Sequence, residues 1–227
     1  MLILAFDSST PVVSVAVFKR GVGLASMAIA RGRSNAAHIL SAIDAVLAQA
    51  GLDLGGLDAL ACAVGPGSFT GLRVGIATAQ GLAEGRGLPV VGVPTLEAYA
   101  HALPGVDGIL CPMVDARKKE VYVAGYRWDG DVPVELWPPV ARSPEGLASK
   151  VGNQSLLLVG EGAAAYRAEL EASLGARARF GPTDLAFSNA LRVARLGADL
   201  LAQGAGADPA ALRPIYGRPS EAELAEA

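Results

Sequence analysis

Apolar residues at the start of the chain come in short runs separated by turns. Residues 2–6 form a continuous apolar run, as expected of a strand that is buried on both faces. Residues 12–18 and 24–29 form two further runs, and the polar "KRG" between them marks a tight turn. The N-terminal pattern therefore predicts three strands in a meander.

After these strands the spacing of apolar residues changes to that of a helix. In residues 36–50, Ile39, Ile43 and Val46 fall on one face at helical spacing, and Gly51 is a natural stop. The elements predicted next are a strand at 60–64, a helix at 72–84, a strand at 88–93 and a helix at 95–103. Together these segments give the order βββαβαβα.

The beginning of the chain repeats after residue 108. The stretch "ILCPMVDARKKEVYVAGYRWDG" can be laid on "LILAFDSSTPVVSVAVFKRG", which places Asp115 on Asp7. We therefore predict two related lobes, residues 1–103 and 104–227, with a tail from about 212 that packs back on the first lobe. Duplicated lobes with an Asp-headed turn in each are typical of actin-like and sugar-kinase-like ATPase folds.

The later part of the second lobe is less regular. It predicts a strand and turn at 156–163, helices at 166–174 and 186–202, and a short last helix where "SEAE" has the spacing of a capping box.

Composition narrows the class of protein. The chain has 227 residues, is 52% hydrophobic and carries a net charge of −3. An acidic chain is not expected to hold a nucleic acid by itself, because phosphate binding depends on Lys and Arg. Cys62 and Cys111 lie in apolar runs and are expected to be buried, and no metal-ligand spacing is present. With no apolar stretch near 18 residues and no basic leader, we expect a cytoplasmic protein.

The stretch "AVGPGSFTGLRVGIATAQGLA" is the most distinctive in the sequence. Its serine does not occupy the centre of a G-x-S-x-G elbow, and Gly71-Leu72-Arg73 stands where a P-loop needs Gly-Lys-Ser/Thr. Two interpretations remain, an anion-binding turn at a helix N-terminus or a plain tight turn. Arg73 in a first helical turn would oppose the helix dipole, which favours a compensating anion or acidic partner.

Two Asp-headed turns and a glycine pair are the candidates for nucleotide binding. The Asp turns could hold a metal and phosphates, or they could be ordinary Asx turns at strand ends. The predicted cleft residues are Asp7, Ser8, Ser9, Asp115, Gly160 and Gly162. We expect Asp7 and Asp115 to face one cleft between the lobes.

The predicted helices at 36–50 and 72–84 carry few charges. Such outer faces are poor solvent faces and allow close approach of another helix, which favours a surface for a partner protein. The candidate interface residues are Ile39, Ala42, Ile43, Ala45, Val46, Phe69, Arg73 and Ile76.

Four stretches together show a resemblance to a known family. "FDSSTPVVSVAV", "VGPGSFTGLRVGIATAQGLA", "VVGVPTLEAYA" and "VDARKKEVYVAGY" are similar to the TsaB family, also called YeaZ, over most of residues 1–126. Further on, "PIYGR" resembles the family's Pro-x-Tyr-x-Arg tail, with Gly217 where a larger apolar residue is usual.

The resemblance implies an actin-like fold, that of the ribonuclease H-like ASKHA class, and a role in making threonylcarbamoyladenosine at position 37 of tRNAs that read codons starting with A. It implies a TsaD-like paralogue as heterodimer partner and a TsaE-like ATPase, with a homodimer when the chain is alone. Contact with tRNA is expected only through the complex. We expect no cofactor to be required by this chain, with ATP or ADP bound in the complex, and no membrane association.

The same resemblance speaks against catalysis by this chain. TsaD-like chains carry two metal-binding histidines on the helix after the strand equivalent to "VVGV", and here those positions are Thr95 and Tyr99. Neither residue is a usual ligand of such a metal. We therefore expect a scaffold subunit without a catalytic or metal site and without glycoprotease activity. A stand-alone ATPase or kinase that uses Asp7 and Asp115 is the alternative hypothesis.

Overall fold

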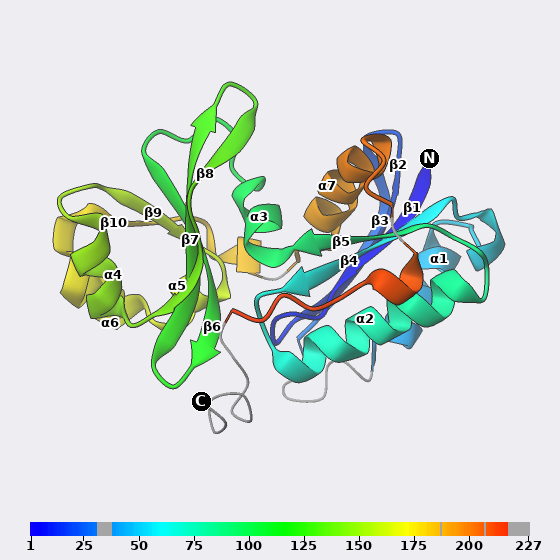
Figure 1. The fold of residues 1–227 in the computed structure, drawn as a ribbon, viewed down its shortest axis with the longest axis horizontal. Coiled ribbons are helices and arrows are strands. Elements are labelled where there is room, and N and C mark those ends of the chain that lie inside the picture. Colours follow the sequence, from blue (N-terminus) through cyan, green and yellow to red (C-terminus); the bar gives the residue numbers. More distant parts are fainter. Residues whose placement is uncertain (31–37, 187, 207, 218–227) are drawn as a thin grey trace. The chain divides into compact units, whose positions relative to one another are not determined.

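The chain divides into two compact units (Figure 1). The computed structural model describes residues 1–30, 38–186, 188–206 and 208–217. Within these ranges, the first unit is formed by Met1–Ala98 and Phe187–Ile215, and the second by Tyr99–Ala186 and Tyr216–Ala227. Each unit is built around one five-stranded mixed sheet.

The first sheet combines an antiparallel meander with two parallel strands. Its strands are β1 (Leu2–Asp7), β2 (Val13–Lys19), β3 (Val22–Ile29), β4 (Ala59–Gly65) and β5 (Val90–Pro94), in the order β3-β2-β1-β4-β5. β1 and β2 pair antiparallel, and β4 runs parallel to both β1 and β5. Because the central strands β1 and β4 are covered on both faces, every residue in them is buried, as their continuous apolar runs predict.

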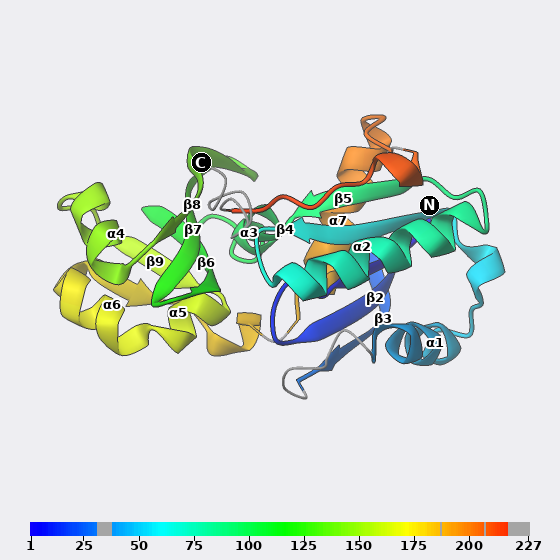
Figure 2. The same ribbon diagram turned by 60° about the horizontal axis from the view of Figure 1, so that its bottom comes forward.

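Helices cover both faces of this sheet (Figure 2). α1 (Ile39–Gln49) and α2 (Phe69–Glu84) pack on one face, and α7 (Ala190–Ala202) packs on the other. The short elements of this part of the chain are η2 (Leu54–Gly56), η5 (Pro209–Ala211) and α3 (Thr95–Ala100), which contains the boundary between the units.

The second sheet has the same topology as the first. Its strands are β6 (Ile109–Arg117), β7 (Glu120–Asp129), β8 (Val132–Arg142), β9 (Leu156–Val159) and β10 (Ala178–Phe180), in the order β8-β7-β6-β9-β10. The other elements of this unit are α4 (Pro144–Val151), α5 (Glu161–Ala165), α6 (Arg167–Leu174), η3 (Gly175–Arg177) and η4 (Thr183–Ala186). The repeat that the sequence predicts is therefore present as two sheets with matching strand order and direction.

The division of the chain differs from the predicted boundary between residues 103 and 104. The helix expected at 186–202 is α7, and it packs on the first sheet rather than in the second lobe. Its apolar side, with Val193 and Ala194, covers Ala61 and Val93 of β4 and β5. At Gly197 an added Cβ would lie 2.6 Å from the Cβ of Ala61, so glycine permits the close approach of helix and sheet.

The segment after α7 also belongs to the first unit. Leu212 is buried in the core beneath α2, and the N–H of Ile215 donates to the carbonyl of Val64 at 2.7 Å. This is the tail for which the sequence suggested a return to the first lobe. The predicted last helix at 220–223 lies outside the described residues.

Candidate functional site

The first candidate site is the turn that follows β1, where Asp7 ends the strand. The residue is 1% exposed. Its Oδ1 accepts a hydrogen bond from the backbone N–H of Ser9 at 2.7 Å, and its Oδ2 accepts one from Nδ2 of Asn189 at 2.8 Å. Asp7 therefore closes an Asx-type turn and also holds the residue that precedes α7.

Ser14 on β2 completes this attachment of α7 to the sheet. Its Oγ accepts hydrogen bonds from the backbone N–H groups of Asn189 and Ala190, at 3.2 and 3.1 Å. N–H groups at a helix start have no partner inside the helix, so this contact stabilises α7. Burial raises the pKa of the Asp7 carboxyl, and hydrogen bonds from Ser9 and Asn189 oppose that rise. The cluster is a polar connection inside the first unit.

The turn between β4 and α2 packs directly on the turn after β1. Ser68 caps α2, because its Oγ accepts from the N–H of Gly71 at 3.2 Å, and its own N–H donates to the carbonyl of Ser9 at 2.6 Å. A Cβ on Gly67 would lie 2.4 Å from the carbonyl oxygen of Ser9, and one on Gly71 would lie 2.0 Å from that of Ser8. The GPGSFTG motif therefore brings two backbones together at distances that only glycine allows.

Arg73 lies further into its helix than the sequence predicts. Because Ser68 provides the cap, α2 begins at Phe69 rather than at Leu72, and Arg73 is in the second turn. The unfavourable effect of the helix dipole is confined to the first turn, so the inference that Arg73 needs a compensating anion loses its basis. The guanidinium carbon lies 3.9 Å from the centroid of the Phe69 ring, within the range of a cation–π contact.

The second candidate site surrounds Asp115, near the end of β6. Its Oδ1 accepts hydrogen bonds from the N–H of Arg117 at 2.7 Å and from the hydroxyl of Tyr166 at 3.0 Å. Its Oδ2 lies 2.9 Å from Nη1 of Arg117, and its side chain is 13% exposed. The N–H of Asp115 donates to Oε1 of Glu161 at 3.0 Å. Burial raises the pKa of Glu161 to about 7, and the negative charge of Asp115 acts in the same direction.

The glycine pair at the start of α5, with Gly160 before the helix and Gly162 in it, allows close packing against β6. A Cβ on Gly160, where φ is +96°, would lie 2.4 Å from the carbonyl oxygen of Met113. One on Gly162 would lie 2.8 Å from the carbonyl carbon of Val114. The strand–turn–helix of the second unit thus uses glycine against β6 in the way that the first unit uses it against the turn after β1.

The hairpin between β6 and β7 has an unusual backbone. Arg117, Lys118 and Lys119 have φ values of +62°, +53° and +63°, and all three residues are exposed. Arg117 pairs with Glu120, so the two lysines are the central residues of the turn. Positive φ at both central positions defines a type I′ turn, which favours Asn-Gly, and another residue in this region costs about 1 kcal/mol.

The six residues predicted for a nucleotide cleft fall into two groups. Asp7, Ser8 and Ser9 belong to the first unit, and Asp115, Gly160 and Gly162 belong to the second. Hydrogen bonds or close packing within its own unit engage each group; the Oγ of Ser8, for instance, donates to the carbonyl of Gly71 at 2.8 Å. That the two groups face one cleft stays a prediction.

The structure corrects most of the predicted partner interface. Five of its eight residues are buried in the core of the first unit, with 5% exposure or less: Ile39, Ala42, Ile43, Val46 and Ile76. These side chains fill the space between the two helices and the sheet, so they cannot also meet a partner. Ala45 is half-buried, while Phe69, at 46%, and Arg73 are exposed. The exposed side of α2 continues through Ala77 and Gly81, four and eight residues beyond Arg73.

Thr95 and Tyr99 lie on α3, and both are buried, at 0% and 1% exposure. Across the ranges that the structure describes, no three His, Cys, Asp or Glu side chains are grouped so that they could hold a metal ion. Cys62 and Cys111 are buried, as the sequence predicts, and burial raises the pKa of the Cys62 thiol to about 12. No helix among the described residues is both long enough and apolar enough to cross a membrane.

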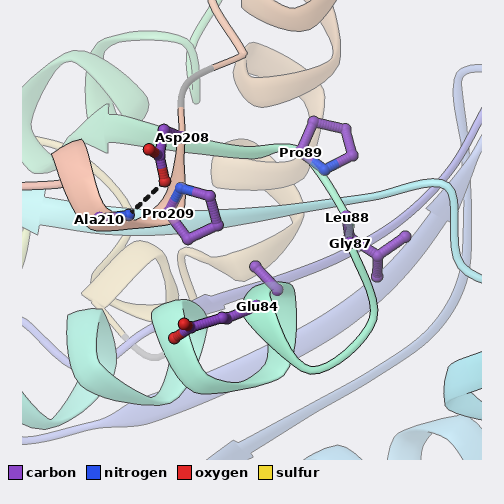
Figure 3. A pocket seen from close by; sticks show the side chains of 8 residues that line it. Glu84, Gly87, Leu88, Pro89, Asp208, Pro209 and Ala210 are labelled. Atoms are coloured by element: carbon purple, nitrogen blue, oxygen red, sulfur yellow. Dashed lines mark hydrogen bonds between the residues drawn. The ribbon is translucent and has the colours of Figure 1, made fainter.

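A hollow of about 420 Å³ opens in the first unit between the end of α2 and η5 (Figure 3). It is lined by Ala83, Glu84, Gly87, Leu88, Pro89, Asp208, Pro209 and Ala210. Gln80 holds η5 beside α2, because its Nε2 donates to the carbonyls of Pro209 and Leu212 at 3.0 and 3.3 Å. None of the residues that the sequence predicts for the nucleotide cleft or the partner interface lines this hollow.

Sequence reasoning missed the residues that complete the two Asp turns. Asn189 directly precedes the apolar pattern of α7, which is a recognisable N-cap signal. Glu161 lies between the two glycines that the sequence singles out. Tyr166 gives no local signal, because only the packing of α5 and α6 beside β6 brings its hydroxyl to Asp115.

Comparisons with known proteins add to this picture. The family described as "TsaD: tRNA N6-adenosine threonylcarbamoyltransferase" matches residues 30–223. The chain is 34% identical to the tRNA threonylcarbamoyladenosine biosynthesis protein TsaB of Haemophilus influenzae, over 95% of this chain and 93% of that one. YeaZ from Pseudomonas aeruginosa has a similar structure, with a TM-score of 0.78 and 27% identity over 95% of this chain and 99% of that chain.

The ROK hexokinase from Thermus thermophilus also matches, with a TM-score of 0.51 and 13% identity over 89% of this chain and 100% of that chain. At this identity the match shows the fold alone. The predicted actin-like fold with two related lobes is confirmed.

Proposed function

The chain belongs to the TsaB family, and we propose that it is a non-catalytic scaffold subunit of the complex that installs threonylcarbamoyl on the adenosine beside the tRNA anticodon. Its relative in Haemophilus influenzae is named for the biosynthesis of this modified nucleoside. In the proposed complex a TsaD-like paralogue carries the transfer chemistry, and a TsaE-like protein is the ATPase.

One observation carries the non-catalytic part of the proposal. Thr95 and Tyr99, which stand where TsaD-like chains have two metal-binding histidines, are both in the interior. Neither a threonine hydroxyl nor a tyrosine phenol is a usual ligand of such a metal, which supports a subunit without that site. The carboxylate of Asp7 supports the same conclusion, since both of its oxygens accept hydrogen bonds from its own unit.

The proposal places the partner on the outer side of α2 and α1. Along α2 the exposed residues Phe69, Arg73 and Ala77 follow one another at four-residue spacing. On α1, Leu40 is 56% exposed. A surface that combines an exposed aromatic ring, an arginine and small residues fits a helix-to-helix contact with a partner protein. The same surface would join two copies of this chain when the TsaD-like partner is absent, by pseudo-symmetry.

Reconstitution tests the function. Purified TsaD-like and TsaE-like proteins, ATP and tRNA would be assayed for threonylcarbamoyl transfer with and without this chain. We expect modification to depend on the chain, and we expect the isolated chain to show no significant ATP hydrolysis. Turnover by the chain alone at ordinary enzyme rates, on the order of 1–10³ per second, would support the alternative of a stand-alone ATPase or kinase.

A pair of variants on one helix tests the surface. Ala77→Glu places a charge on the exposed side of α2, and Ala79→Glu places it in the core, where Ala79 is 0% exposed. We expect Ala77→Glu to keep the wild-type Tm but to lose the TsaD-like partner in a pull-down, because the charge would be buried unpaired in the complex. Ala79→Glu should lower the Tm sharply. Unchanged partner binding by Ala77→Glu would show that the partner docks elsewhere.

A further inference from the structure

We propose that the tip of the β6–β7 hairpin, Arg117–Lys119, contacts the phosphodiester backbone of the RNA on which the complex acts. The inference rests on the proposed function, since it names a contact between this subunit and the tRNA. It goes beyond the expectation that this chain meets tRNA only through the complex, because it assigns one contact within that complex to residues of this chain. The observations that carry it are the backbone of the tip, the residues chosen for it and the contacts behind it.

The backbone of the tip adopts a left-handed conformation that its three residues do not favour. Among the described residues, positive φ is adopted by eleven glycines and only four other residues, Arg20 and the three residues of the tip. Outside the tip, every described residue with positive φ except Arg20 is therefore a glycine. At the tip it places three basic side chains in succession where Asn-Gly would fold more easily. A residue that occupies such a position against its local preference points to a function of its side chain.

Lysine is rare in this chain, which makes the lysine pair at the tip more distinctive. Only four of its 227 residues are lysine, and two of these four are Lys118 and Lys119. The chain as a whole carries a net charge of −3. A pair of adjacent lysines at the end of a hairpin is therefore a local exception, placed where two ammonium groups can reach a ligand without a change of fold.

Contacts behind the tip hold it in place. Asp115 binds both the N–H and the guanidinium of Arg117, at 2.7 and 2.9 Å, and Tyr166 and Glu161 in turn hold Asp115. The side chain of Arg117 is nevertheless 72% exposed. Such support from a partly buried network reduces the ordering that binding would otherwise require. Guanidinium and ammonium groups are the side chains that bind phosphate.

Nearby carboxylates limit how much the tip can contribute. Glu120 faces Arg117 across the β ladder, and the charge of Lys119 is one of the influences that lower the pKa of Glu145, after hydrogen bonds to the Glu145 backbone and to Ser143. Because Arg117 is bound by Asp115, we assign the phosphate contacts, about two in number, to the exposed side chains of Lys118 and Lys119. The tip would therefore assist RNA binding by a complex rather than support it alone.

The double variant Lys118→Asn/Lys119→Gly tests this with two readouts that move in opposite directions. It supplies the preferred type I′ turn and removes both charges, so the Tm should rise while tRNA binding weakens. In the complex with the TsaD-like partner, we expect the Kd for fluorescently labelled tRNA at physiological salt to increase roughly 10-fold. The slope of log K against log salt should fall by about 1.5, as expected for two lost phosphate contacts.

Arg20→Asn is the matched control. Arg20 and Gly21 are the central residues of the β2–β3 turn, where both have positive φ, so the change also makes an Asn-Gly turn and removes an exposed cation. We expect a higher Tm and unchanged tRNA binding.

Three results would overturn the proposal. One is a double variant that binds tRNA with the wild-type Kd and salt slope. Another is a loss confined to the TsaD-like partner, which would mean that the tip meets an acidic protein surface. The third is a loss of ATP binding with tRNA binding intact, which would identify a nucleotide phosphate as the ligand. If the wild-type chain proves unnecessary for modification, the proposed function fails instead, whatever the variants bind.

Discussion

The two units carry the same Asp-headed turn in different surroundings. In each, Oδ1 accepts the N–H of the residue two positions ahead at 2.7 Å, from Ser9 to Asp7 and from Arg117 to Asp115. Asp7 is then covered by Asn189, whereas Asp115 is bound by Tyr166 and by an exposed arginine. The same local geometry thus forms a buried contact with the start of α7 in the first unit. In the second unit it supports the basic tip of a hairpin.

The difference shows that a motif of this kind fixes a backbone turn and leaves its chemistry open. The loop after Asp7 is bound to the start of α2, because Ser8 donates to the carbonyl of Gly71 and the carbonyl of Ser9 accepts the N–H of Ser68. Ser14, on the strand that follows, holds the start of α7. The loop after Asp115 is closed by Lys118 and Lys119 at the surface. The residues after the aspartate, and the helix that packs on it, decide its role.

The largest effect is expected where α2 packs on the turn after β1. Gly71→Ala would place Cβ 2.0 Å from a backbone oxygen, which cannot move without displacing the strand, so we expect a loss of about 3 kcal/mol or more in the free energy of unfolding. Gly81→Ala on the same helix meets nothing within 4 Å and should gain about 0.5–1 kcal/mol. Urea unfolding of both variants gives the two values. Equal, small effects would mean that the contact between the two turns is loose.

We expect the stability of the second unit to depend on pH through Glu161. Its pKa is raised from 4.5 to about 7, so the folded state binds this proton more tightly than the unfolded state. The resulting stability is fully present below pH 4.5 and is lost as the pH rises through about 7. The difference corresponds to on the order of 3 kcal/mol.

Glu161→Gln should remove this pH dependence, since the amide keeps an oxygen for the N–H of Asp115 and carries no charge. Chemical unfolding of the second unit between pH 4 and pH 8 is the measurement. A Glu161→Gln variant with the same slope against pH as the wild type would assign the dependence to another group.

A smaller effect compares the partners of the two aspartates. Asn189→Ala leaves Oδ2 of the buried Asp7 without its donor and should cost about 1–3 kcal/mol, the usual range for an unsatisfied buried group. Tyr166→Phe should cost less than about 1 kcal/mol, because Asp115 keeps Arg117 as a partner. Thermal unfolding at pH 7 would rank the two. A larger loss of stability for Tyr166→Phe than for Asn189→Ala would contradict the distinction between the buried turn at Asp7 and the more exposed turn at Asp115.

Much of the architecture could be predicted from the sequence because it depends on patterns among residues that are close together in the chain. The continuous apolar runs of β1 and β4 indicate buried strands, and the helical spacing of Ile39, Ile43 and Val46 indicates α1. The likeness of the segments around Asp7 and Asp115 predicts two related sheets. The predictions that were wrong concerned which side of a helix faces solvent. Ala42 reads as small and uncharged, which suits an outer surface as well as a core, and only the angle at which α1 meets the sheet places it inside.

The sequence by itself determined the fold class, the repeat, the family and the unusual residues of the GPGSFTG turn and of the lysine pair, because each depends on neighbours along the chain. Tertiary structure alone decided that α7 belongs to the first unit, that Asn189 covers Asp7 and that Tyr166 reaches Asp115. These contacts join residues 182 and 51 positions apart, and no local propensity records such a pairing. The roles of the two aspartates therefore depend on packing between distant segments, which hydrophobic burial drives without leaving a local signature.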